Sequence, residues 1–460
     1  MEYTRVIISD LHVGQNDEFD IFAGPNKAKL FTNFIQHLRD KKKPIELIIN
    51  GDFVDFLQLQ PWNDLSRSAA LIKIRQITKE SAYFFDELGN FLKDEENELV
   101  VLPGNHDVEL AFPEVGKVLR EAILRNAPGA AKRIQMFDSP NFRRSTYRPT
   151  INGVLVQIEH GNEGDPWNSL TYQQLFTDAE TAAEKFEYPP GTKLVYESMN
   201  EFKGELKFVD LLKPEMPAVP LILFALKPLM AARNVPSVAI KNLESIVNAV
   251  RVAIRRSSNG PQLGSTTDEA PSLTVAEKLE NFFTDELPPN PPSILDVEQL
   301  WEGEENEGAV LGPKFDHIKL WFVSWAVRGL ARFQAKERGK AFYQENHPHN
   351  YAVKGAKKRL SGDVKLVIFG HTHEALKTEF ENGVYVNSGT WANLIDLPKD
   401  VRSEMLEWLK KLADNEFEKT AFPTFIELEP VTSGVDVSLN SWSVKGAEQL
   451  WTKNISPSNS

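Results

Sequence analysis

The chain has 460 residues, of which 41% are hydrophobic and 25% are charged, as in ordinary globular proteins. Its formal net charge of −13 argues against a general nucleic-acid binder, which usually carries a basic surface. Cysteine is absent, so disulfides and thiolate ligands are excluded, and any metal must be held by oxygen and imidazole. Because 460 residues are many for one compact core, we expect a main domain with an insertion or a second domain.

Residues 1–165 alternate short apolar runs with segments of helical periodicity, which is the pattern of an α/β sheet. The apolar runs predict buried strands, and the periodic segments predict amphipathic helices. In chain order, the predicted strands are 6–9, 47–50, 99–103 and 153–158, the last paired with 142–147, and the predicted helices are 27–43, 66–93 and 113–125.

Residues 166–350 have a different character, and we interpret them as a largely helical insertion, or cap. The most apolar stretch, 219–230, is shorter than the ~20 apolar residues that span a bilayer. We interpret it as a buried helix, with contact to a membrane surface or an acyl chain as the alternative. The predicted helices of this region are 169–187, 237–256, 274–283 and 316–338.

The α/β pattern resumes after the insertion, so the main domain is predicted to be discontinuous, with residues 1–165 as its first part and 351–460 as its second. Its later strands are expected at 366–369, 383–388, 424–428 and 435–439, with a helix at 400–413.

Five of the predicted strands are followed by residues that bind metals. A strand that ends with a carboxylate beside a glycine commonly places a ligand at the rim of a sheet. We therefore predict a metal site at one edge of a sheet. Its candidate ligands, in chain order, are Asp10, His12, Asp52, Asn105, His160, His371 and His373.

The spacing of the candidate ligands predicts two ions. Asp10 and His12 are two residues apart at a strand end, so their side chains are expected to point the same way and to chelate one ion. His371 and His373 have the same spacing, but we expect each of them to bind a different ion. Asp52 has two carboxylate oxygens and can bridge both ions.

Asn105, through its side-chain carbonyl oxygen, and His160 complete the ligand set of the second ion. These oxygen and nitrogen donors suit manganese, which we expect first, or iron, zinc or magnesium. Two such ions ~3.5–4 Å apart form the clamp used for displacement at phosphorus, with a bridging water that becomes hydroxide. His106 is placed to act as a general acid for the leaving oxygen or to stabilise developing charge, and Asp55 to orient its ring.

These motifs together resemble the signature of the calcineurin-like metallophosphoesterase superfamily, over residues 1–165 and 350–440. The resemblance implies an α/β fold, a four-layer α/β/β/α sandwich with a dinuclear site at the sheet edges, and His106 as the catalytic histidine. It implies that one ion is held by Asp10, His12, Asp52 and His373, and the other by Asp52, Asn105, His160 and His371. The motifs are Asp10-x-His12, Gly51-Asp52-x-x-Asp55, Gly104-Asn105-His106-Asp107, His160 and Gly370-His371-x-His373.

The chain departs from two branches of this superfamily. In the protein Ser/Thr phosphatases, Gly-Asp-x-x-Asp is followed by Arg-Gly, and the arginine binds phosphate. In this chain, Phe56 and Leu57 stand at those two positions. The long insertion before the last motif is similar in layout to the UDP-2,3-diacylglucosamine pyrophosphohydrolase branch, in which a helical lid covers the substrate. That branch typically has arginine at the position of His106.

The leading hypothesis is a metal-dependent phosphoesterase that hydrolyses a phosphomonoester, phosphodiester or pyrophosphate bond of a small molecule or nucleotide. The alternative is a DNA nuclease, because repair exonucleases of the superfamily use the same ligands. Two basic runs would then contact the phosphate backbone, although each is also typical of a solvated charged face. A non-catalytic scaffold is a third hypothesis, disfavoured because no ligand is missing. The basic runs are Lys354, Lys357, Lys358 and Arg359, and Arg251, Arg255 and Arg256.

We also expect a cytoplasmic protein without membrane contact. The first predicted strand begins within a few residues of Met1, and a cleaved leader would remove the candidate ligand Asp10. The histidines outside the motifs are expected to be structural or exposed; they are His37, His317, His347 and His349.

Overall fold

The computed structural model describes somewhat over half of the chain in detail. Nearly all of the predicted helix 169–187, the predicted helices 237–256, 274–283 and 316–338, and the apolar stretch 219–230 lie outside the described residues. The described residues are 2–22, 25–61, 64–136, 145–165, 168–170, 172, 188–204, 206–212, 343–345, 351–360, 362–395 and 405–457.

The chain forms two compact units. The first comprises Met1–Thr192, Glu337–Leu394 and Thr420–Ser460, and the second comprises Lys193–Lys336 and Ile395–Lys419. All the candidate ligands belong to the first unit. The boundaries expected from the sequence, after residues 165 and 350, stay a prediction, because most of the chain between them lies outside the described residues.

A seven-stranded sheet in the first unit has the order β16-β15-β14-β1-β2-β3-β4. The strands β1 to β4 pair in parallel, while β14, β15 and β16 extend the sheet in antiparallel pairing. The parallel register pairs Ile8 with Ile49 and Asn50 with Leu102, so three strands end at the same level. The bounds are β1 Thr4–Ile8, β2 Ile45–Asn50, β3 Glu98–Leu102, β4 Ile134–Met136, β14 Thr424–Val431, β15 Gly434–Ser443 and β16 Gly446–Ile455.

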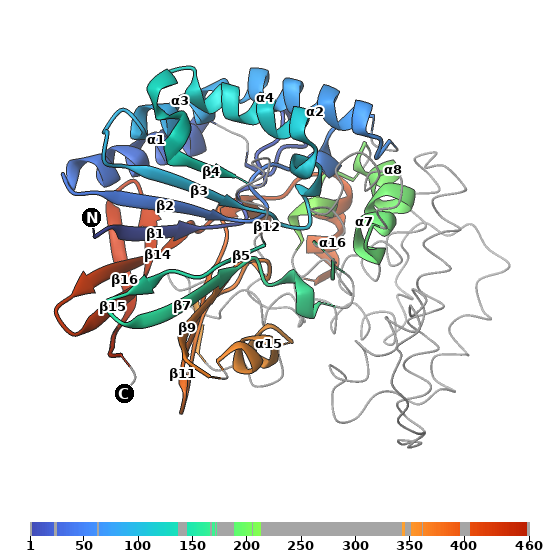
Figure 1. Cartoon of the computed structure of the whole chain (residues 1–460). Helices are drawn as coiled ribbons and strands as arrows, with labels where there is room; N and C mark the ends of the chain where they lie inside the picture. The colour runs from blue at the N-terminus through green and yellow to red at the C-terminus, as the bar shows by residue number, and fades with distance from the viewer. Residues whose placement is uncertain are drawn as a thin grey trace, which may run out of the picture. The chain divides into compact units, whose positions relative to one another are not determined.

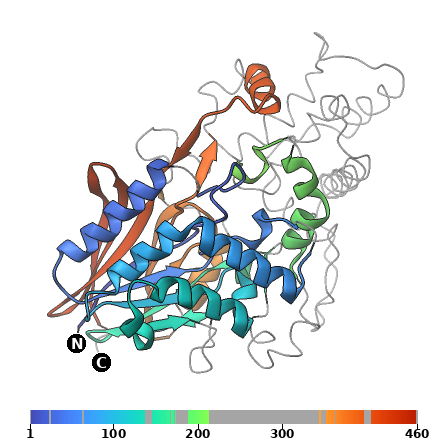
Figure 2. The same cartoon turned by 90° about the horizontal axis from the view of Figure 1, so that it is seen from above.

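Four helices cover one side of this sheet (Figures 1 and 2). Val6, Ile8 and Leu47 belong to a buried cluster shared with these helices, whereas Ile7 and Ile48 are equally buried but lie outside it. Alternate residues of a strand face opposite sides, so both faces of the sheet are covered, and the strands are continuous apolar runs for this reason. The helices are α1 Pro25–Asp40, α2 Arg67–Glu80, α3 Ala82–Phe91 and α4 Pro113–Leu124.

The single helix predicted over residues 66–93 is wrong, because the structure divides it at Ser81. Ser81 leaves helical geometry with φ −104° and ψ 30°, while its backbone N–H still donates to Ile77. Its hydroxyl donates instead to the carbonyl of Gly14, 2.8 Å away. Serine hydroxyls that bond backbone outside the helix compete with helical pairing. The break therefore ties α2 and α3 to the loop that follows β1.

A second sheet in the same unit joins strands from both sides of the insertion, in the order β5-β7-β9-β11-β10-β8, with β6 also paired to β7. β7 precedes the insertion and β9 follows it, yet the two pair in parallel, with Val156 opposite Leu366. Helix α15 (Tyr351–Arg359) packs against this sheet through Val353 and Ala356. The strands are β5 Thr146–Tyr147, β6 Thr150–Ile151, β7 Val154–Glu159, β8 Tyr343–Glu345, β9 Val364–Phe369, β10 Ala375–Phe380 and β11 Gly383–Ser388.

The α/β class predicted from the sequence is confirmed by these two sheets and their helices. The predicted strands of residues 1–165 and 351–460 are present, including the pairing of 146–147 with β7. Seven of the described strands were not predicted, namely β4, β6, β8, β10, β16 and the short strands β12 (Asn393–Ile395) and β13 (Lys419–Ala421).

The described part of the second unit is small. Lys203 at the end of α8 (Asn200–Lys203) pairs with Asp210 at 2.6 Å. Helix α16 (Met405–Ala413) confirms the described part of the helix predicted over residues 400–413. Among the described helices, none is both long enough and apolar enough to cross a bilayer.

Candidate metal centre

The candidate ligands come together where strands of two sheets end. Asp10, Asp52 and Asn105 follow β1, β2 and β3 of the first sheet, whereas His160 and His371 follow β7 and β9 of the second. The prediction that the metal site lies at one edge of a single sheet is therefore wrong. The prediction that the candidate ligands come together is right. The sequence could not separate the strands, because their apolar runs are alike and the pairing of β7 with β9 spans the insertion.

Hydrogen bonds hold the two sheets together at this point. The side-chain amide of Asn50 donates to the carbonyl of Glu159 at 2.8 Å. The backbone N–H of His371 donates to the carboxylate of Asp10 at 3.0 Å. The loop after β1 is fixed in turn to the loop after β2, since His12 N–H donates to the carbonyl of Asp52 at 2.9 Å. The ligand loops of both sheets thus form one network.

Five candidate ligands occupy the left-handed backbone region, which non-glycine residues rarely adopt. Nine non-glycine residues of the described chain have positive φ, so the candidate ligands account for more than half of them. Such conformations cost of order 1–3 kcal/mol each and concentrate at functional sites. The five are Asp10 at 53°, His12 at 49°, Asp52 at 48°, His371 at 67° and His373 at 59°.

These angles also correct the reason given for the Asp10 and His12 pair. Strand β1 ends at Ile8, so neither residue lies in a strand, and period-two alternation does not orient them. Two left-handed residues turn the loop instead. The side chains of Asp10 and His12 do come together as predicted. The reason is the conformation of the loop, which residue propensities do not predict.

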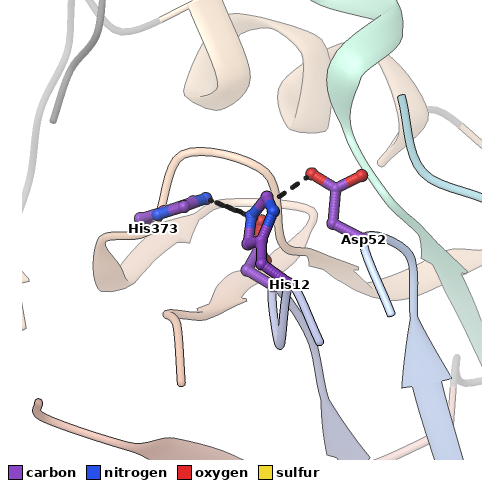
Figure 3. Close-up of side chains that lie close together, drawn as sticks. His12, Asp52 and His373 are labelled. Atoms are coloured by element: carbon purple, nitrogen blue, oxygen red, sulfur yellow. Dashed lines mark hydrogen bonds and ion pairs between the residues drawn. The ribbon is translucent and has the colours of Figure 1, made fainter. Parts of the chain in front are cut away.

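The first ligand group contains Asp10, His12, Asp52 and His373, whose ligand atoms all lie within 4.8 Å of one another. His12 Nε2 lies 3.1 Å from His373 Nε2 and 3.7 Å from Asp52 Oδ2 (Figure 3). His373 Nε2 also lies 3.2 Å from Asp10 Oδ1. All four side chains are buried, with exposed fractions of 0–3%.

The second ligand group contains Asp52, His160 and His371, again within 4.8 Å of one another. His160 Nε2 lies 3.2 Å from Asp52 Oδ2 and 3.2 Å from Asn105 Oδ1, so the amide oxygen joins this group. Asp52 belongs to both groups. The structure thus brings together all seven candidate ligands in the two sets that the resemblance implied.

The donor atoms are spaced as neighbouring ligands of one cation would be. Metal–nitrogen bonds of about 2.0–2.1 Å place neighbouring ligand atoms roughly 2.8–3.4 Å apart in octahedral or tetrahedral geometry. The separations of 3.1 Å between His12 and His373 and of 3.2 Å between His160 and Asp52 fall in that range. The donors are carboxylate, amide and imidazole, which suit a first-row divalent cation. The residues therefore fit two ions.

Asp55 contacts two histidines through the same oxygen. Its Oδ2 lies 2.9 Å from His12 Nδ1 and 3.0 Å from His106 Nδ1, and it accepts from Gln58 Nε2 at 2.8 Å. A carboxylate only accepts, so both histidines carry a proton on Nδ1 and direct Nε2 elsewhere. The predicted contact with His106 is present, and the contact with His12 was not predicted.

The charges at the site compensate one another. Burial alone would raise the pKa of Asp52, but His160 and the neighbouring imidazoles hold that pKa well below its usual value. Burial would likewise raise the pKa of Asp55, which the contact with His106 lowers well below the usual value. Burial lowers the pKa of His160, yet the Asp52 carboxylate outweighs it and raises the pKa to about 9. The carboxylates therefore form a site that favours positive charge.

Two glycines let the carboxylates approach the backbone. A Cβ atom on Gly104 would overlap Asp52 Oδ1, the oxygen that accepts from the N–H of His106 at 2.9 Å. A Cβ atom on Gly370 would overlap Ser9 and the carboxylate of Asp10. The glycines before Asn105 and His371 are therefore required by the contacts of the carboxylates.

Sequence reasoning missed two carboxylates at the site. Asp107 accepts hydrogen bonds from the backbone of Gly104 and of Phe53, both at 2.7 Å, and so joins the loops after β2 and β3. Burial, aided by the charge of Asp52, raises the pKa of Asp107 to about 7. Its place in the Gly-Asn-His-Asp motif was a usable signal. Asp165 lies 2.9 Å from His371, and no pattern in the sequence marked it.

The remaining polar candidates lie away from the ligand groups or outside the described chain. His37 packs against the ring of Trp442, 5.1 Å away between centroids, as expected of a structural histidine. Arg359 binds the carboxylates of Glu159 and Glu163. Lys354, Lys357 and Lys358 are exposed on α15. His317, His347, His349, Arg251, Arg255 and Arg256 lie outside the described residues.

Comparison with known proteins agrees with this geometry. None of the curated proteins compared matches the chain. A family model described as calcineurin-like phosphoesterase matches residues 3–201, which contain five of the seven candidate ligands. The structure adds the other two, His371 and His373, from beyond the matched residues. Over residues 3–201, the chain is therefore similar to the calcineurin-like phosphoesterase family.

Proposed function

We propose that the chain is a phosphoesterase that requires two divalent cations and hydrolyses a phosphomonoester, phosphodiester or pyrophosphate bond of a small molecule or nucleotide. The observation that carries the proposal is the pair of buried ligand groups that share Asp52. Members of the family are generally metal-dependent hydrolases of phosphoesters, which agrees with this arrangement.

In this proposal each group of side chains holds one cation, and manganese is the ion to test first. Asp10, His12 and His373 complete the first set, and Asn105, His160 and His371 the second, with Asp52 in both. When bound, the two cations supply an activated water and withdraw charge from the phosphoryl oxygens. The chain itself contributes the fixed orientation of the ligands, which the left-handed loops and the hydrogen bonds to Asp55 maintain.

His106 is the proposed general acid. Its Nδ1–H is bound to Asp55 Oδ2, so the ring is oriented and Nε2 is the nitrogen that carries or delivers a proton. Its side chain is only 13% exposed, yet it is the least buried member of the cluster around Asp55. A leaving oxygen that approaches this side of the site receives its proton from His106.

The insertion is the proposed cap that selects the substrate. Strand β7 leads into residue 166 and β9 follows the end of the insertion, and these two strands are neighbours. Asp165, just before the predicted insertion, lies 2.9 Å from His371, and the ring of Tyr351, just after it, lies 6.2 Å from that of His371 between centroids. These two contacts support a cap that begins and ends near the candidate ligands. We also propose the four-layer α/β/β/α order for the core, on the basis of the family and of the two sheets with their helices.

One feature argues against a protein Ser/Thr phosphatase. Where that branch has a phosphate-binding arginine after Gly-Asp-x-x-Asp, this chain has Phe56, which is completely buried in the core cluster. Any cationic side chain that binds the phosphate group would therefore have to come from another part of the chain. The substrate is therefore sought among small phosphate esters and nucleotides.

The proposal is tested by an activity panel on the purified chain with manganese. The panel compares p-nitrophenyl phosphate, bis-p-nitrophenyl phosphate and nucleotides with single-stranded and double-stranded DNA, each with and without EDTA. We expect turnover of small esters that EDTA abolishes, and its loss in Asp52→Asn but not in Asp363→Asn, an exposed aspartate outside the site. Degradation of DNA at low enzyme concentration would favour the nuclease instead, and inactivity with every metal would refute the proposal.

A further inference from the structure

The ligand histidines differ in which ring nitrogen is held by a hydrogen bond. His12 is held at Nδ1 by Asp55, and His160 is held at Nδ1 by the carbonyl of Asn50, 2.9 Å away. Both therefore direct Nε2 toward the ligand groups. His371 is held at the opposite nitrogen, since its Nε2 lies 2.9 Å from Asp165 Oδ2.

This contact fixes the proton of His371. An aspartate oxygen accepts hydrogen bonds, so the proton of this pair lies on Nε2 of the imidazole. A neutral imidazole has one protonated nitrogen, and the other then carries the lone pair that binds a metal. Among the described residues, no hydrogen bond reaches His371 Nδ1. Nδ1 is therefore the ligand atom that His371 offers to the second group.

Asp165 is itself rigidly held. Its Oδ2 accepts from the side chain of Asn168 at 2.8 Å, and its backbone carbonyl accepts from Ser169 at 2.8 Å. Its backbone N–H donates to Asn162 at 3.0 Å. The side chain is 10% exposed and that of His371 is 6% exposed, so water competes little for the contact.

His371 is thus held at its backbone and at its ring. Its backbone N–H donates to Asp10, which belongs to the first group, and its Nε2 is bound by Asp165. Asp165 comes from the other side of the insertion, 206 residues earlier in the chain, immediately before the predicted insertion begins. One carboxylate at that boundary therefore controls a ligand from β9.

We propose that Asp165 is a positioning residue for the second cation, which it serves by holding His371 as the tautomer that binds through Nδ1. The inference rests on the proposed function, because it assumes two bound cations. Carboxylates that orient a ligand histidine typically change metal affinity or activity by about 10–100-fold when they are removed. Asp165 does not touch the substrate or the cation in this account.

The test is a manganese titration of the full chain by calorimetry, with bound metal counted after dialysis. In Asp165→Ala we expect the second ion to bind about 10–100-fold more weakly and the first ion to bind as in wild type. Asp165→Asn should recover part of the loss, because its amide oxygen can accept from Nε2. Glu163→Gln is the matched control, since Glu163 lies nearby but pairs with Arg359.

Equal weakening of both ions, or unchanged binding of the second, would overturn the proposal. If Asp165→Ala does not fold, the test is made on the metal-free wild-type chain. The ¹⁵N NMR resonances of its histidine rings then show which ring nitrogen of His371 carries the proton. We expect His371 to be protonated on Nε2, and protonation on Nδ1 instead would reject the inference. Failure of the proposed function has a separate signature, because wild type would then bind fewer than two ions.

Discussion

At the scale of single residues, Asp55 links two tasks. The same oxygen contacts His12, a candidate ligand of the first cation, and His106, the proposed general acid. Gln58 and the backbone N–H of Leu57 also donate to this carboxylate, so it does not rotate freely. The orientation of the metal ligand and that of the acid therefore depend on one side chain.

This shared contact predicts that two substitutions have different effects. His106→Ala should lower kcat by about 10²–10⁴-fold and leave manganese binding unchanged, because it removes only proton transfer. Asp55→Ala should lower kcat and also weaken binding of the first ion by about 10–100-fold, because His12 and His106 both lose the oxygen that accepts from Nδ1. Steady-state kinetics together with manganese titration separates the two. Wild-type kcat in His106→Ala would refute its role.

Glu109 provides a prediction about pH. Burial raises its pKa to about 7, although Lys73 and the nearby hydroxyl of Tyr188 lower it. A carboxyl group whose pKa is higher in the folded state than in the unfolded state stabilises the fold. This stabilisation is complete at pH values below the pKa of the unfolded state, and it is lost as the pH rises through the folded-state pKa of about 7. Glu109→Gln stays neutral, so its stability relative to wild type should increase from pH 5 to pH 8, by at most about 3 kcal/mol. Thermal unfolding at both pH values measures this difference, and a constant difference would contradict it.

At the scale of elements, the site is built from the loops that follow strands. Their left-handed residues and closely approached glycines are held by hydrogen bonds between loops, such as that from the N–H of Phe53 to Asp107. Because these loops are packed against one another, a change in one is expected to displace ligands supplied by another.

Gly104→Ala tests this dependence. Its new methyl group would overlap Asp52 Oδ1, so Asp52 must move or the backbone must shift. We expect weaker binding of both ions and a loss of roughly 1–3 kcal/mol in unfolding free energy, as for other overpacked sites. Gly129→Ala is the matched control, because nothing lies within 4 Å of its Cβ position. Equal metal binding in the two variants would contradict this account of the loop.

Sequence patterns predicted the elements better than their connections. The runs that became β1, β2, β3, β7 and β9 were recognisable because they are largely apolar and are followed by polar candidate ligands. The break at Ser81 was not predictable, since it depends on a hydrogen bond to Gly14 in a distant loop. The same holds for Asp165, whose partner His371 lies beyond the insertion. Local patterns carry propensity and burial, whereas these features depend on tertiary contacts.

At the scale of the whole chain, the site requires both sides of the insertion. His160 precedes it, while His371 and His373 follow it, and the pairing of β7 with β9 brings them together. The family match ends at residue 201, so it includes only the first part of this arrangement. The sequence motifs indicated all seven candidate ligands, but only the structure shows that they form two groups around Asp52.

The central claim, that Asp52 joins two cation sites, is tested most directly by counting manganese ions bound per chain. Wild type should bind two, and Asp52→Asn should weaken both, because the bridging carboxylate contributes to each group. Asp363→Asn should bind as wild type does. A wild-type chain that binds fewer than two ions, or an Asp52→Asn variant that keeps one ion at wild-type affinity, would contradict the claim.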